Sequence, residues 1–120
     1  MPTILVVDDD EMFRDIYEDI LEDEGYDLIM AENGRLGVDA AIAHMPNLIV
    51  MDMNMPEMTG FEAMKLISTN AATSKIPILA VTSENATVIH EEIYESGGSA
   101  YLSKPIDAER LVERINDLLA

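Results

Sequence analysis

The feature that most limits how this chain can fold is a strict alternation of short apolar runs with segments of helical periodicity. The apolar runs, which are typical of strands, occupy residues 3–7, 26–30, 48–51, 77–81 and 99–102. Helical segments follow them at 11–24, at 35–44, from Thr59 to a polar loop at 68–75, at 86–96, and after Asp107. Five such units predict a parallel sheet with helices on both faces, in one doubly wound α/β domain over residues 1–120.

Local signals set the expected helix ends. Gly25 is a C′ residue for the first helix, Thr59 and Glu62 have capping-box spacing, and Asp107 is the expected N-cap of the last helix. Asn33-Gly34 is expected to close the second strand as a turn, and the second helix should end before Met45-Pro46. The first helix is expected to be amphipathic, because its apolar residues recur at helical spacing: Met12, Phe13, Ile16, Tyr17, Ile20 and Leu21.

The helix at 86–96 has the sparsest apolar stripe, with Val88, Ile89 and Ile93, so we expect it to be loosely held. His44 and His90 both fall on polar helix faces away from the strand ends. We therefore expect both histidines to be ordinary surface residues.

Composition excludes several classes of function. The net charge of −17 repels nucleic acid and anionic lipid, so DNA binding by this chain is not expected. No apolar run approaches the ~20 residues of a membrane span, and the N-terminus has no signal pattern. The absence of cysteine fits a reducing compartment, so we expect a cytoplasmic protein with no membrane insertion.

Carboxylates follow two of the expected strands. The first strand ends in Asp8, Asp9 and Asp10, and the buried run at 48–51 ends in Asp52. If these strands are parallel neighbours, charges ~4–5 Å apart repel by roughly 3–4 kcal/mol per pair at an effective dielectric constant of 20. Such repulsion indicates a bound cation or another bound ligand that offsets it. Carboxylates without His or Cys suit Mg²⁺, and the spacing lacks the glycine and glutamate of calcium loops.

Two further strand ends carry a hydroxyl and an ammonium, at Thr82 and Lys104. In a doubly wound sheet the ligand site lies beyond the carboxyl ends of the strands, so these groups should meet the carboxylates. Together with a metal they can neutralise the oxygens of a phosphoryl group. Asp52 stands between the acidic pair and the Thr/Lys pair, so it is the best candidate to attack phosphorus and form an acyl phosphate.

In these features the chain resembles the receiver domains of two-component response regulators, and most of all the single-domain chemotaxis regulators. The matching motifs are Asp8-Asp9, Asp52 in D-M-N-M-P, Thr82 in A-V-T-S and Lys104 in S-K-P. The resemblance covers the whole chain. It implies a five-stranded parallel sheet of order 2-1-3-4-5, of the flavodoxin-like type.

The resemblance also implies roles for the site residues. Asp52 would accept a phosphoryl group from a phosphohistidine of a sensor kinase or phosphotransfer protein. Asp9, Asp52 and the carbonyl of Asn54 would bind Mg²⁺, with Asp8 holding a metal-bound water. Lys104 would pair with the phosphoryl group and Thr82 would hydrogen-bond to it. Tyr101 matches the aromatic switch position, and the Lys104-Pro105 peptide matches a cis bond.

A protein of this kind is a signalling switch rather than an enzyme, although it assists its own phosphorylation and slow autodephosphorylation. Its further partner would be a downstream protein target or a phosphatase, and we expect a monomer. One departure from the motor-binding chemotaxis regulators is the acidic surface of the helix at 86–96, with Glu91, Glu92 and Glu95 where those regulators tend to carry lysines. This difference argues against a flagellar-motor partner.

Two alternatives stay open at the level of sequence. A haloacid-dehalogenase-type phosphohydrolase also has a D-x-D motif after its first strand, which Asp8 to Asp10 satisfies, but its nucleophile lies on that strand and it needs a cap. The chain can also be a receiver piece of a longer DNA-binding regulator, although the lack of linker-like residues near Ala120 favours a stand-alone protein. A dinucleotide binder is excluded because no glycine-rich turn follows the first strand.

Overall fold

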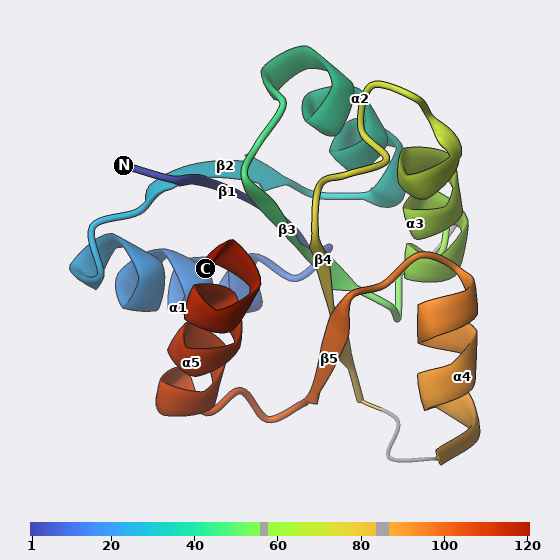
Figure 1. Ribbon diagram of the computed structural model, residues 1–120. Helices are drawn as coiled ribbons and strands as arrows, with labels where there is room; N and C mark the ends of the chain where they lie inside the picture. The colour runs from blue at the N-terminus through green and yellow to red at the C-terminus, as the bar shows by residue number, and fades with distance from the viewer. Residues whose placement is uncertain (56–57, 84–86) are drawn as a thin grey trace.

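The computed structural model describes residues 1–55, 58–83 and 87–120, with the backbone alone described at 87–89. A twisted sheet of five parallel strands runs through the molecule in the order β2-β1-β3-β4-β5, with helices on both faces (Figure 1). The fold class and strand order expected from the sequence are thereby confirmed. The elements, in chain order, are β1 Thr3–Val7, α1 Glu11–Asp23, β2 Asp27–Ala31, α2 Gly34–His44, β3 Leu48–Asp52, α3 Gly60–Thr69, β4 Ile78–Thr82, α4 Thr87–Glu95, β5 Ala100–Ser103 and α5 Ala108–Leu119.

The sheet separates two apolar cores because neighbouring side chains of a strand point to opposite faces. On one face, Ile4 and Val6 of β1 pack with side chains of α1 and α5. On the other face, Leu5 and Val7 pack with side chains of α2, α3 and α4. Figure 1 shows this division, with α1 and α5 on one side of the sheet. All five residues of β3 are buried, which makes it the central strand that its apolar run predicted.

Several element boundaries differ by one residue from those expected. The second, fourth and fifth strands each begin and end one residue later than their apolar runs, so that Thr82 closes β4 and Ser103 closes β5. Asn33 does not close a turn. Its side chain accepts a hydrogen bond from the Leu36 amide at 2.8 Å, so Asn33-Gly34 begins α2.

The expected helix caps are present. The Thr59 hydroxyl accepts from the Glu62 amide at 3.2 Å, and the Asp107 carboxylate accepts from the amides of Glu109 and Arg110. Gly25 follows α1 with a φ of 86°, a conformation that glycine adopts without steric cost. No helix within the described residues has the length and apolar character needed to cross a membrane.

The apolar stripe of α1 is only partly buried. Tyr17 and Leu21 lie in the core, whereas Met12 is 62% exposed and Ile16 is 37% exposed. The amphipathic helix expected from the periodicity is present, but these two apolar residues of its stripe lie at the surface. Periodicity shows that a helix has an apolar face, but the width of that face covered by neighbours depends on how the helix rotates against the sheet.

Candidate functional site

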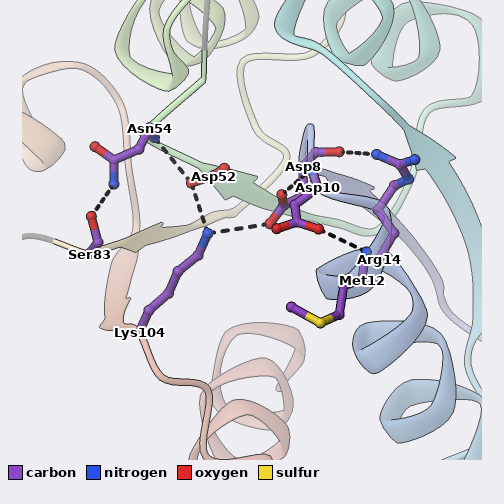
Figure 2. A network of polar contacts seen from close by, with 8 residues as sticks. All are labelled: Asp8, Asp10, Met12, Arg14, Asp52, Asn54, Ser83 and Lys104. Atoms are coloured by element: carbon purple, nitrogen blue, oxygen red, sulfur yellow. Dashed lines mark hydrogen bonds and ion pairs between the residues drawn. The ribbon is translucent and has the colours of Figure 1, made fainter.

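The strand register brings the predicted site residues to one edge of the sheet. Val7 pairs with Met51, so Asp8 follows β1 directly beside Asp52 at the end of β3. On the other side, Thr82 at the end of β4 pairs with Ser103, and Lys104 comes next. Figure 2 shows the side chains of Asp8, Asp52 and Lys104 pointing toward one another.

Asp8, Asp9 and Asp52 form a compact carboxylate cluster. One oxygen from each residue lies within 4.8 Å of the other two. Asp8 and Asp52 are buried, at 0% and 1% exposure, whereas Asp9 is exposed. In the part of the chain that the structure describes, the Oδ2 atoms of Asp8 and Asp52 are buried without a hydrogen-bond partner. Buried carboxylate oxygens with spare lone pairs are ligands for a hard cation, so this cluster can hold a metal ion.

Lys104 supplies the positive charge that faces the cluster. Its Nζ lies 3.5 Å from Asp52 Oδ1 and 3.7 Å from Asp8 Oδ2. The same Nζ lies 4.1 Å from the centroid of the Phe13 ring. The Lys104 amide donates to the Thr82 carbonyl at 2.8 Å, which ties the two strand ends together. The Lys104-Pro105 peptide is cis, as the family resemblance implied.

Burial raises the pKa of both buried carboxyl groups. The pKa of Asp52 rises from 3.8 to about 6, chiefly because burial disfavours its charged form, and the charge of Asp8 adds to this effect. The Asn54 amide and the Lys104 ammonium act in the opposite direction. The pKa of Asp8 is raised as well, again mainly by burial. One ammonium therefore offsets only part of the cost of keeping two carboxylates charged here.

The first turn of α1 fixes the position of Asp8. The Asp10 amide donates to Asp8 Oδ1 at 2.9 Å, and the Asp10 carboxylate accepts from the Met12 amide at 2.9 Å. Asp10 is thus the N-cap of α1, and it lies outside the carboxylate cluster found among the described residues. Arg14 Nη1 donates to the Asp8 carbonyl at 2.6 Å. The role of Arg14 was not predicted, because it depends on a contact with a backbone atom.

The loops after β3 and β4 are joined beside Asp52. The Asn54 amide donates to Asp52 Oδ1 at 3.1 Å, and Asn54 Nδ2 donates to Ser83 Oγ at 2.9 Å. Gly60 packs so closely beneath this loop that a Cβ there would overlap the Asp52 carbonyl. Glu84, which also follows β4 in the sequence, lies outside the described residues.

Tyr101 lies on β5 and is half-buried against the core that the sheet forms with α2, α3 and α4. The ring of His90 on α4 stacks on it, with the ring centroids 3.8 Å apart and the planes tilted by 33°. The prediction that His90 is an ordinary surface residue was therefore wrong, whereas His44 is exposed as expected. The spacing of apolar residues in α4 could not indicate this contact, because the partner of His90 lies on another element.

The chain is similar to proteins of a known family. Residues 4–116 match the family described as the response regulator receiver domain. The polar-differentiation response regulator DivK of Brucella anthropi is 35% identical over 117 residues, which is 98% of this chain and 95% of that protein. The DivK of Brucella ovis is 34% identical over the same shares.

Solved structures agree with the fold. The chemotaxis protein CheY4 of Vibrio cholerae superposes with a TM-score of 0.94 at 32% identity, covering 99% of both chains. The receiver domain of the sensor histidine kinase PA1611 from Pseudomonas aeruginosa superposes with a TM-score of 0.91 at 24% identity, covering 98% and 97%. That structure holds a magnesium ion in its active-site cleft, and the likeness to it concerns the fold.

Proposed function

This chain belongs to the response regulator receiver domain family, and we propose that Asp52 is the residue through which it is switched by phosphorylation. The observation that supports this choice most strongly is the placing of Lys104 Nζ 3.5 Å from Asp52 Oδ1. Asp52 also ends the central strand, between the Asp8 side of the site and the Thr82 side. A phosphoryl group on Asp52 would thus lie beside both a cation and a hydroxyl donor.

The transfer step follows from this arrangement. A carboxylate oxygen of Asp52 forms a bond to phosphorus while the P–N bond of a phosphohistidine donor breaks, and the electron pair stays on the imidazole nitrogen. Lys104 is placed to neutralise charge on the phosphoryl oxygens, and Thr82 to donate a hydrogen bond to one of them. The donor would be a histidine kinase or a phosphotransfer protein. The chain itself is then a phospho-acceptor that assists its own phosphorylation and slow autodephosphorylation, not an enzyme acting on a separate substrate.

The donor set of the carboxylate cluster suits a hard cation such as Mg²⁺. Asp8, Asp9 and Asp52 offer oxygen ligands only, and two of these oxygens are buried without a hydrogen-bond partner among the described residues. When bound, Mg²⁺ would neutralise negative charge on the phosphoryl oxygens. The Asn54 carbonyl is the further ligand that the family resemblance implies.

The output surface would be the face formed by α4, β5 and α5. Tyr101 connects that face to the site, since it lies on the strand that ends next to Lys104 and contacts His90 of α4. A downstream protein target or a phosphatase would bind there, in the cytoplasm. The surface of α4 is acidic, with the exposed residues Glu91, Glu92 and Glu95. A partner that binds the motor-binding chemotaxis regulators would therefore fit this surface poorly.

Intact-mass spectrometry with Mg²⁺ and acetyl phosphate tests the choice of Asp52. Wild-type protein should gain one phosphoryl group, and Asp52→Asn should gain none at a comparable rate. Asp10→Asn is a matched control, because asparagine caps a helix as well as aspartate does and Asp10 lies outside the cluster. A phosphoryl group mapped to Asp8 instead would favour the phosphohydrolase alternative and contradict the proposal.

A further inference from the structure

We propose that Phe13 is a positioning residue for Lys104: its aromatic face holds the ammonium beside Asp8 and Asp52. This inference rests on the proposed function only for its effect on phosphorylation. The contact itself is a property of the folded chain, with Lys104 Nζ 4.1 Å from the Phe13 ring centroid.

The carboxylates alone do not fix the ammonium. Its distances to Asp52 Oδ1 and Asp8 Oδ2, 3.5 Å and 3.7 Å, exceed the usual 2.7–3.2 Å of an N–H···O hydrogen bond. A lysine side chain is flexible, and its charge has no directional fork such as arginine presents. An attraction from a third group therefore decides how far the ammonium swings toward solvent.

The Phe13 ring can provide that attraction. A cation is drawn to the face of an aromatic ring within about 6 Å of its centroid, and more strongly when the pair is shielded from water. Lys104 is only 16% exposed, which meets this condition. The ammonium thus has two carboxylates as neighbours, and the polarisable face of the Phe13 ring is a third neighbour.

The ring is itself held in place by its helix. Phe13 is half-buried against the core formed with α5, and the Tyr17 ring lies one turn further along the same face of α1. The start of α1 is fixed by the Asp10 cap and by the bond from Arg14 to the Asp8 carbonyl. The turn that orients Asp8 therefore also sets the position of the Phe13 ring beside Lys104.

Side-chain NMR of the metal-free protein tests the contact without any activity measurement. The chain has three lysines, Lys65, Lys75 and Lys104, so lysine-labelled spectra are simple to assign. The ε-methylene protons of Lys104 should be shifted upfield by the ring in wild type and in Phe13→Tyr, and should lose that shift in Phe13→Leu. Ile20→Ala is the matched control, because Ile20 packs on the same core from the same helix. An unshifted Lys104 signal in wild-type protein would overturn the inference even if every variant failed to fold.

A double-mutant cycle tests the consequence for phosphorylation by acetyl phosphate with Mg²⁺. We expect Phe13→Leu to slow the reaction about three- to tenfold, which is the range of a partly shielded cation–π contact, and Phe13→Tyr to restore it. In a Lys104→Met background, Phe13→Leu should have no further effect.

The outcomes separate this inference from the proposed function. If the two changes multiply as independent effects, or Phe13→Leu reacts at the wild-type rate, Phe13 does not act through Lys104. If Lys104→Met itself reacts at the wild-type rate, the proposed role of Lys104 fails, and the NMR result still decides whether Phe13 positions the ammonium.

Discussion

The imidazole of His90 lies against the phenol ring of Tyr101, with the two centroids 3.8 Å apart. This contact joins α4 to β5 at the residue that we expect to respond to phosphorylation. A movement of Tyr101 toward the site would require the stack to slide or break. His90 is therefore part of what holds the present arrangement of the α4 and β5 side chains.

Replacing His90 should weaken that arrangement. An aromatic pair contributes about 0.5–1.5 kcal/mol beyond its buried area, so His90→Ala should shift the amide signals of residues 90–103 toward their positions in the beryllofluoride-bound protein. His44→Ala serves as the control because His44 is exposed on α2. Identical responses to the two substitutions in amide NMR spectra would show that the stack does not bias the switch.

The buried charge of Asp52 should make the metal-free protein less stable as the pH rises. Its pKa is raised from 3.8 to about 6 in the folded protein, so between these values the folded state retains a proton that the unfolded chain has lost. The free energy of unfolding therefore falls as the pH increases through this window, and this one group accounts for about 2 kcal/mol of the loss.

Urea denaturation in EDTA at pH 4 and pH 7 measures this effect. Asp52→Asn should gain stability relative to wild type between the two pH values, because it has no charge to bury. Asp10→Asn should show no such gain, since Asp10 is exposed. A difference between Asp52→Asn and wild type that stays constant with pH would mean that Asp52 is not destabilised by its surroundings.

Much of the fold was accessible from the sequence because its signals are local. The run from Leu48 to Met51 is apolar on both faces, and only a central strand buries both faces. Asp107 and Thr59 cap helices as their spacing indicated, because a cap depends on residues within one turn. The residues of the carboxylate cluster could be found because parallel strands end at the same edge.

Contacts between distant elements were not accessible in the same way. Nothing in the first helical stripe distinguishes Phe13, which meets Lys104, from Met12 and Ile16, which remain exposed. His90 and Arg14 likewise owe their roles to partners on other elements or to a backbone carbonyl. Such assignments need the rotation of each helix against the sheet, which periodicity leaves undetermined.

Mg²⁺ should stabilise the wild-type protein through the carboxylate cluster. At a hundred times its dissociation constant, a ligand that binds only the folded state adds about 2.7 kcal/mol. Asp9→Ala should lose most of this increment while changing metal-free stability little, because Asp9 is exposed. Thermal melting with and without Mg²⁺ measures both effects, and an undiminished increment in Asp9→Ala would remove Asp9 from the metal site.

The coupling between Asp52 and the face formed by α4, β5 and α5 is tested most directly by amide NMR with beryllofluoride, which mimics a phosphoryl group on an aspartate. Coupling of roughly 1–3 kcal/mol between site and surface is typical of such switches. In wild type, the largest shifts outside the site should fall between Thr82 and Leu111. In Thr82→Ala, the shifts around Asp52 should remain and most of the distal shifts should disappear. Distal shifts that cluster on α1 and α2, or that survive intact in Thr82→Ala, would contradict a switch that runs from Asp52 through Thr82 to Tyr101.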